Sequence, residues 1–431
     1  MKKIILIIVS LIFFIPQVYA VTLSEALTQA YNNNPELNAE RENIKVSEED
    51  LNISKGEYQP TLTLSGSKSK EDTNKLTNQS GSDAAVTDVD PQTTSITIEQ
   101  TLFDAGRSAD HEKNKIGIKL AIAKLLKKEQ DILYKAIEAY TGLILANEKF
   151  EINKTNVSLL ERQVETDSIR LERGQVTLSD VAQSESSLAE AQAKVIQAQN
   201  EVLTSKLNYE TIIGPLSSSN LLEKNSTINF VMPQNLNSAI EISKKNNPDL
   251  NIALLEYEQS EKDTIIAKSD LSPTAKLSFE RSYSDDLSST YDQREKDILK
   301  ATVSWPFYSG GKNRAKYKKN RNLQNRKRLL LDNTTKLNET NVASAWSNFQ
   351  SSKSLLNSVE LQVRAAEIAN EGITAEYESG FGRTTLEVIQ SSSFLLNAQI
   401  SLANSERNYL LSQFNLLKSI GLLNSDYLKI K

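Results

Sequence analysis

Two stretches of the chain alternate apolar and polar residues, and a polar segment interrupts each of them. In the first, Leu62 and Leu64 follow Pro60, and the alternation resumes at residues 95–102 after the polar segment 68–94. The second covers residues 277–283 and 299–307 around the polar segment 284–295. A period of two over such lengths is typical of strands. The pattern therefore predicts two β-hairpins, at about 59–103 and about 272–307, each with a polar loop.

Beyond each hairpin the chain is predicted to be helical over long distances. There is no proline between Pro91 and Pro215 and none after Pro306. We expect long helices at about 106–171 and about 311–378, each followed by a return helix, at about 178–214 and about 385–421. At 1.5 Å per residue, each long helix would extend roughly 95 Å. Helices of this length do not fit inside one globule of this size, so they require other helices alongside them.

The return helices carry an apolar residue at almost every seventh position. The first series runs from Val181 to Tyr209 and the second from Val388 to Leu416, and the positions three residues later are mostly small. A seven-residue repeat is typical of left-handed coiled coils, and small residues allow close helix approach. An ordinary bundle with an apolar face is the alternative, but the length of the leading helices favours the coiled coil.

Self-comparison indicates that the chain is internally duplicated. Residues 34–37 (Asn-Pro-Glu-Leu) return as residues 247–250 (Asn-Pro-Asp-Leu), residues 180–214 return as residues 387–421, and two further matches keep the same order. We therefore expect a first repeat at 21–214 and a second repeat at 235–421. A linker at 215–234 would join them, and a tail at 422–431 would follow.

The first twenty residues have the pattern of a secretory signal peptide. Lys2 and Lys3 precede a short apolar run that ends at the small residue Ala20, so residues 1–20 are predicted to be removed and the mature chain to begin near Val21. A retained membrane anchor is the alternative, although the run is short for a membrane span. An exported chain without cysteine has neither disulfides nor thiolate metal sites. Its net charge of −5 argues against nucleic acid as a partner.

The two hairpins supply only four strands, whereas the smallest closed membrane barrels need about eight. An open sheet in lipid would leave backbone groups without hydrogen bonds, so a barrel would have to close between chains. Aromatic residues fall where the girdle of such a barrel would meet the membrane interface, at Tyr58, Phe103, Trp305, Phe307 and Tyr308. A soluble sandwich is the alternative for either hairpin alone.

The order of these features resembles the TolC family of outer-membrane efflux proteins. The resemblance rests on a Leu-Ser-Glu-Ala-Leu opening at 23–27, an Asn-Asn-Pro-Glu-Leu turn at 33–37, a strand ending in Leu-Phe-Asp-Ala-Gly at 102–106, and long helices in two tandem copies. It implies a predominantly α-helical α+β chain without enzymatic activity. Three copies would form a twelve-stranded transmembrane β-barrel in the outer membrane and an antiparallel coiled-coil tunnel of twelve helices in the periplasm.

The resemblance further implies a mixed equatorial domain, made of the linker 215–234 and the tail 422–431. It also implies the partners: a periplasmic adaptor protein, an inner-membrane efflux pump or ABC transporter, and outer-membrane lipid. No cofactor and no nucleic acid is expected.

By the same resemblance, a gate closes the periplasmic end of the tunnel. Asp180, Tyr377 and Arg383 would link inner and outer helical pairs, and three copies of Glu387 would ring the constriction. Gln390 stands where some family members carry a second aspartate, which predicts a weaker anionic ring. Solvated residues with weak surface ion pairs are the alternative for this region.

Glycines mark the two segments where the long helices turn back. Gly174, Gly380 and Gly382 provide the backbone freedom that a tight reversal needs, and we expect these turns to contact the adaptor. One extra residue lies between Gly380 and Arg383 compared with the usual family pattern, which weakens the assignment of Arg383.

Other candidate chemistry in the sequence is sparse. A basic cluster follows the last predicted strand, and we expect it to contact anionic headgroups or to line the tunnel rather than to bind nucleic acid. Its members are Lys312, Arg314, Lys316, Lys318, Lys319, Arg321, Arg326, Lys327 and Arg328. His111 is the sole histidine, and no phosphate loop, nucleophile motif or zinc motif is present.

These observations predict an outer-membrane channel-tunnel for efflux or type I protein secretion, which an adaptor and an inner-membrane transporter open at its periplasmic tip. A periplasmic coiled-coil adaptor without its own barrel is the alternative, and an exported structural coiled coil is a third. The duplication of both hairpins and helices favours the channel. Drug, protein and metal cargo share such a component, so the sequence leaves the cargo open.

Overall fold

A computed structural model describes residues 20–77, 79–83, 88–216, 222–224, 230–288, 291–380 and 382–430. The predicted signal peptide, apart from Ala20, and residues 217–221 and 225–229 of the predicted linker lie outside these ranges. The chain divides into two compact units. The helical unit comprises residues up to 38, 126–247 and 338–431, and the strand-bearing unit comprises residues 39–125 and 248–337.

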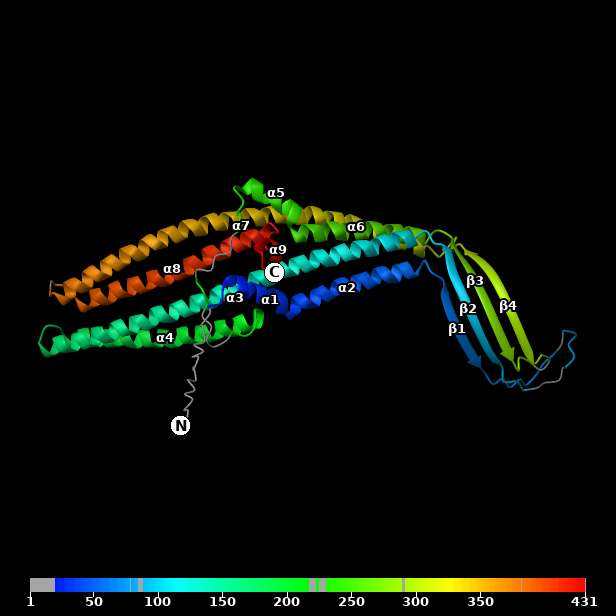
Figure 1. Ribbon diagram of the computed structural model, residues 1–431, viewed down its shortest axis with the longest axis horizontal. Helices are drawn as coiled ribbons and strands as arrows, with labels where there is room; N and C mark the ends of the chain where they lie inside the picture. Colours follow the sequence, from blue (N-terminus) through cyan, green and yellow to red (C-terminus); the bar gives the residue numbers. More distant parts are fainter. Residues whose placement is uncertain are drawn as a thin grey trace, which may run out of the picture. The chain divides into compact units, whose positions relative to one another are not determined.

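The order of elements repeats along the chain (Figure 1). Two helices, two strands and a pair of long helices occur twice, and a short helix follows. The helices are α1 (Leu23–Asn33), α2 (Pro35–Gly56), α3 (Arg107–Glu172), α4 (Leu178–Ile212), α5 (Leu236–Asn246), α6 (Pro248–Ser269), α7 (Lys312–Glu378), α8 (Thr385–Ser419) and α9 (Ser425–Leu428). The strands are β1 (Thr61–Lys68), β2 (Gln92–Phe103), β3 (Thr274–Asp285) and β4 (Gln293–Ser304).

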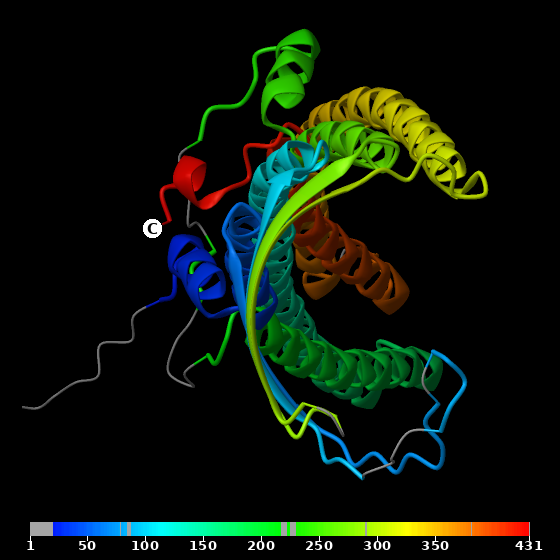
Figure 2. The same ribbon diagram turned by 90° about the vertical axis from the view of Figure 1, so that its right-hand side faces the viewer.

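The strands form one antiparallel sheet in the order β1-β2-β3-β4, which follows a single curve in Figure 2. The register places Leu62 opposite Ile98, Ile98 opposite Phe279, and Phe279 opposite Leu299, so an apolar row crosses all four strands on one face. Ser and Thr residues dominate the other face, because successive side chains of a strand point to opposite sides. Apolar residues of the first face are strongly exposed, and Leu299 reaches 72%.

Four helices of the strand-bearing unit lie in a row in the order α2-α3-α6-α7. The hydroxyl of Ser54 on α2 lies 2.9 Å from Nδ1 of His111 on α3. Lys113 on α3 forms an ion pair of 2.8 Å with Asp263 on α6, and Lys327 on α7 lies 2.6 Å from Glu256 on α6. The helical row thus has the same sequential order as the strands of the sheet.

In the helical unit, α3 and α4 form one antiparallel hairpin and α7 and α8 form another (Figure 1). Small residues on the return helices are buried, as close approach requires: Ser184, Ala191 and Ala198 on α4, and Ala398, Ser405 and Ser412 on α8. The main apolar core of the unit gathers side chains of α1, α3, α4, α5, α7, α8 and α9. The Tyr140 hydroxyl donates to the carbonyls of Val21 and Glu223, each at 2.8 Å.

The repeated Asn-Pro motif has one structural role in both copies. The side-chain amide of Asn34 donates to the carbonyl of Ile212 at the end of α4, and that of Asn247 donates to Ser419 at the end of α8. The Asn34 carboxamide oxygen also accepts the backbone N–H of Glu36, at the start of α2. Each asparagine therefore joins a helix beginning to a distant helix end, and this shared task explains why the motif recurs.

The observed elements confirm the predicted fold class, a mainly helical and internally duplicated chain with four antiparallel strands. Among the helices of the described ranges, we find none whose length and apolarity would suit a membrane crossing.

Candidate functional site

The turns of both long hairpins end in the same local structure. Thr177 begins α4, and its hydroxyl accepts the N–H of Asp180, whose carboxylate in turn accepts the N–H of Thr177 at 2.8 Å. Thr384 and Glu387 form the same reciprocal pair at the start of α8. Such capping boxes satisfy donors that the first helical turn leaves free. Asp180 and Glu387 therefore fix the beginnings of the return helices.

The capping bonds also change the acidity of both carboxyl groups. The hydrogen bonds from Thr177 lower the pKa of Asp180 below its usual range. For Glu387, the backbone N–H of Thr384 is the main cause of a lowered pKa, and Arg383 adds to it. Both groups therefore keep their negative charge to a lower pH than ordinary exposed carboxylates.

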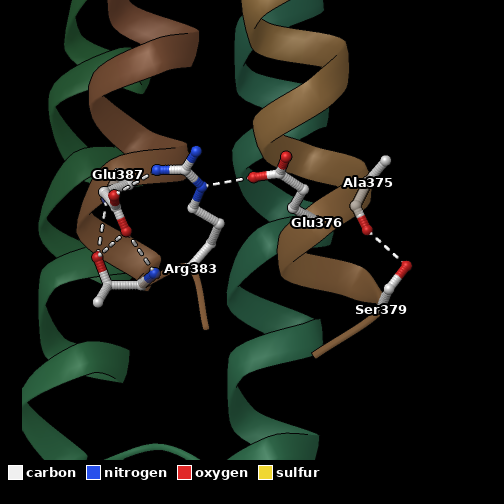
Figure 3. A network of polar contacts seen from close by, with 6 residues as sticks. Ala375, Glu376, Ser379, Arg383 and Glu387 are labelled. Carbon is white, nitrogen blue, oxygen red and sulfur yellow. Dashed lines mark hydrogen bonds and ion pairs between the residues drawn. The ribbon is translucent and has the colours of Figure 1, made fainter. Parts of the chain in front are cut away.

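Arg383 bridges the two helices of its own hairpin (Figure 3). Its Nε lies 2.6 Å from a carboxylate oxygen of Glu376 on α7, and its Nη1 lies 2.9 Å from Glu387 on α8. The three side chains are 38–49% exposed, so water and salt weaken these ion pairs. Arg383 partly neutralises the acidic groups at this tip.

A buried polar network ties the two hairpins of the chain together. Asp167 on α3 is completely buried and accepts hydrogen bonds from the hydroxyls of Tyr377 on α7 and Ser184 on α4. The side-chain amide of Gln163 also donates to it, at 2.9 Å. The Tyr377 hydroxyl lies 3.0 Å from the hydroxyl of Thr385 on α8. One carboxylate thus connects α3, α4, α7 and, through Tyr377, α8.

Arg170 strengthens the same junction from α3. Its guanidinium donates to the carbonyls of Tyr377 at 2.9 Å and Glu378 at 3.2 Å, where α7 ends. It also lies 4.1 Å from the centre of the Tyr377 ring, within the range of a cation–π interaction. Burial, together with the hydrogen bond to Asp167, raises the pKa of Tyr377, so the phenol stays a proton donor.

The glycines of the two turns adopt the left-handed conformation. Gly174 has φ 70°, Gly380 has φ 78° and Gly382 has φ 81°. A Cβ atom at any of these positions would meet no other atom within 4 Å, so backbone conformation rather than space favours glycine here.

The structure brings some of the predicted gate residues together and separates others. Arg383 pairs with Glu387, as described above. Tyr377 is buried and bonds to Asp167, whereas the carboxylate of Asp180 contacts Thr177 in its own turn. Gln390 is exposed on α8.

Sequence reasoning missed Asp167 and Arg170, which are central to the network. Asp167 follows Leu160 by seven residues and lies between Val164 and Leu171 on the inward face of α3. A carboxylate at an apolar position of a heptad pattern was the available signal, because a buried charge requires partners. No such signal marks Arg170, whose partners are backbone carbonyls.

The site has the properties of a structural latch and not of a catalytic centre. Its polar groups satisfy one another, and hydroxyl, carboxylate and guanidinium groups meet at the place where four helices end or turn. Within the described ranges, no cluster of three or more potential ligands could hold a metal ion.

Comparison with known proteins gives a family match over most of the chain. The model of the family described as "Outer membrane efflux protein" matches residues 26–215 and again residues 239–422. The chain is 25% identical over 413 residues to the outer membrane efflux protein BepC of Brucella suis, covering 95% of this chain and 87% of BepC. It is 23% identical over 354 residues to the alkaline protease secretion protein AprF of Pseudomonas aeruginosa, covering 80% and 72% of the two chains.

The fold also agrees with solved structures. The outer membrane protein VceC of Vibrio cholerae superposes with a TM-score of 0.78 at 18% sequence identity, over 93% of this chain and 96% of VceC. This superposition confirms the fold, and the match of the family model to residues 26–215 and 239–422 confirms the family expected from the sequence.

Proposed function

This chain belongs to the outer membrane efflux protein family, and from this premise we propose that three copies share one pore, which an adaptor and an inner-membrane transporter open at its periplasmic tip. The chain is an outer-membrane efflux or secretion channel and not an enzyme. Our proposal concerns the number of subunits in the channel, its gate and its partner proteins.

The sheet is the observation that carries the proposal. Within the described strands, β1 pairs with β2 alone and β4 pairs with β3 alone, so two edges have no partner strand. In lipid such edges are costly, and closure into a barrel removes them. Three copies supply twelve strands, with the row of Leu62, Ile98, Phe279 and Leu299 toward lipid and the polar face toward the pore.

The aromatic residues next to the strands support this orientation. Trp305, Phe307 and Tyr308 are 60%, 85% and 84% exposed and follow the end of β4. Large exposed aromatic side chains at strand ends are typical of the membrane interface. At the other end of the sheet, Arg281 lies near Asp297 on the apolar face, where the hydrocarbon region would end.

In the closed channel, the Asp167–Tyr377 network holds the two hairpins of each subunit together. Asp180, capped by Thr177, and Arg383, paired with Glu376 and Glu387, lie at the two tips and help to link inner and outer helical pairs, while three copies of Glu387 form an anionic ring. Gln390 adds no charge to that ring. Opening is a population shift: partners that bind the spread arrangement of tips more tightly than the closed one favour it.

The adaptor binds the tips at the two turns. Gly174, Gly380 and Gly382 lie in these turns, and a Cβ atom built at each of them would lie in open space. The similarity to BepC, an efflux protein, and to AprF, a protease secretion protein, supports both classes of transporter as partners.

Planar lipid bilayers test the pore directly. The purified protein should produce discrete current steps of one unit size, whereas a barrel that fails to close would give none. Leu299→Lys is the matched control, because a cation on the lipid face should prevent insertion. Absence of current from protein that is folded and trimeric would contradict the proposal.

A further inference from the structure

A cavity lies inside the helical unit, between α3 and α8, and shares no residue with the buried network around Asp167. Its volume is about 80 Å³. One water molecule requires roughly 10–15 Å³, so the cavity has room for a larger guest. Apolar side chains form much of its wall: Leu23, Ile144, Leu145, Ala403 and Leu410. This size and lining suit a small molecule with an apolar body.

Three charged side chains of the cavity wall pair with one another. Lys224 lies 2.7 Å from a carboxylate oxygen of Glu406 on α8 and forms a second ion pair with Glu148 on α3. Burial acts to lower the pKa of Lys224, but the hydrogen bonds and charges of the two glutamates outweigh it and raise the pKa. The lysine therefore stays charged, and both of its acidic partners come from the chain itself.

Arg407 on α8 also lines the cavity, and one of its donors has no acceptor. Its Nη2 donates to the carbonyl of Glu138 on α3 at 3.4 Å, whereas its buried Nε finds no hydrogen-bond partner among the described residues. Burial raises the pKa of Tyr134 and the charge of Arg407 opposes this rise, but a protonated phenol does not neutralise the guanidinium. A buried donor of a charged group is costly without an acceptor, so Nε requires one from outside the chain.

The residues that shape this cavity occur in only one of the two copies. An offset of 207, which relates α4 to α8, places Ile196 at the position of Ala403 and Asn200 at the position of Arg407. Ile196 is 69% exposed, and Asn200 is exposed as well. The architecture that both copies share therefore does not account for the small residue and the arginine on α8.

We propose that this cavity binds a small monocarboxylate with an apolar body. The carboxylate accepts the Nε–H of Arg407, and the apolar part packs against Ile144 and Leu145. Such charge-assisted hydrogen bonds are roughly twice as strong as those between neutral groups. Glu148 and Glu406 on the same wall disfavour a second negative charge on the ligand. The site lies within one chain, so it does not depend on the proposed trimer.

Saturation-transfer NMR of the detergent-purified full chain tests the site, with butyrate as the probe. Wild-type protein should give a saturable signal. Arg407→Gln should weaken the affinity by about tenfold or more, because the charge-assisted hydrogen bond is lost. Arg364→Gln is the matched control and should bind like the wild type, since Arg364 is exposed on α7 and does not line the cavity. Butyramide, which has the same apolar body without the charge, should bind about tenfold more weakly than butyrate.

The size of the cavity gives a second, independent readout. Ala403→Val narrows the cavity and should abolish butyrate binding. Leu410→Ala widens it and should bind hexanoate more tightly than the wild type does, a gain that a misfolded variant does not produce. Folded wild-type protein without saturable butyrate binding would overturn the proposal, as would binding that neither Arg407→Gln nor Ala403→Val changes. Equal affinities for butyrate and butyramide would overturn the assignment of a carboxylate.

Discussion

The hydroxyl of Tyr377 on α7 donates a hydrogen bond to the buried carboxylate of Asp167 on α3, across 210 residues of sequence. Ser184 and Gln163 donate to the same carboxylate, so a single buried charge holds donors from three helices. A buried carboxylate is stable only with such partners, and the loss of either side leaves polar groups unsatisfied. The junction is therefore cooperative and sensitive to single substitutions.

Replacing Asp167 with alanine should loosen the tip. The substitution leaves the buried hydroxyls of Tyr377 and Ser184 without their acceptor, at a cost of about 1–3 kcal/mol for each. We expect a higher mean conductance in planar bilayers and more frequent open events. Tyr377→Phe should act in the same direction with a smaller effect, because it leaves the carboxylate with its other donors.

Glu190→Gln is the control for this experiment, since Glu190 forms only an exposed pair with Lys194 on α4. Its conductance should match that of the wild type. Wild-type conductance in Asp167→Ala protein would show that the network does not hold the tip closed.

Arg383→Gln should make the pore more selective for cations. Arg383 lies 2.9 Å from Glu387, and its removal leaves the glutamate ring with its full negative charge. Glu387→Gln should reduce cation selectivity. Reversal potentials in a salt gradient measure both effects, and Gln390→Ala, which changes no charge, is the control. Equal reversal potentials in all variants would remove Glu387 from the ion path.

The pH dependence of that selectivity follows from the lowered pKa of Glu387. The ordinary value is 4.5, and hydrogen bonds from Thr384 and the nearby Arg383 lower the pKa of Glu387, so the ring should keep its charge to a lower pH than ordinary glutamates would. In Arg383→Gln protein the pKa rises toward its usual value, and selectivity should begin to fall at a higher pH. The capping box of Thr384 and Glu387 depends on pH in the same direction. Its stabilising contribution is complete above the ordinary pKa of Glu387 and is lost as the pH falls through the lowered pKa.

The turn glycines should tolerate alanine poorly. At Gly174 (φ 70°) and Gly380 (φ 78°), a Cβ in the left-handed region costs about 1–2 kcal/mol. This should raise local opening of the turn about 5- to 30-fold. Trypsin cleavage after Arg173 measures it at the first turn. Gly372→Ala is the control, because this glycine lies within α7 and alanine favours a helix by about 1 kcal/mol.

The two faces of the sheet should differ in their tolerance of charge. Leu299→Lys places a cation on the apolar face, which costs about 2–4 kcal/mol near the middle of a bilayer. Ile298→Lys places the same charge on the opposite face, beside water in the proposed pore. We expect the first variant to lose most of its heat-modifiable trimer from the outer membrane and the second to keep it. Equal loss in both variants would mean that neither face meets lipid.

Periodicity was sufficient to predict the long helices, the paired strands and the duplication, because each depends on a repeating pattern of apolar positions. The Asn34 and Asn247 motifs were visible as repeated letters, and the structure adds their physical task, the joining of helix ends. The capping boxes were also present in the sequence, as Thr177 with Asp180 and Thr384 with Glu387 at the required spacing.

The buried network around Asp167 and Tyr377 could not be predicted from the sequence alone. Its partners lie on α3 and α7, far apart along the chain, and no repeat relates Asp167 to Tyr377. Arg170 binds backbone carbonyls, so no complementary side chain in the sequence indicates its role. Contacts of this kind depend on how two hairpins pack, which the pattern of a single helix does not specify.

The mass of the particle extracted from outer membranes tests the central claim most directly. Light scattering, with the detergent contribution subtracted, should give a mass of three chains per particle for the wild type. This mass should stay the same at every dilution at which the particle remains folded. A well-folded single chain that remains in aqueous solution without detergent would contradict the account.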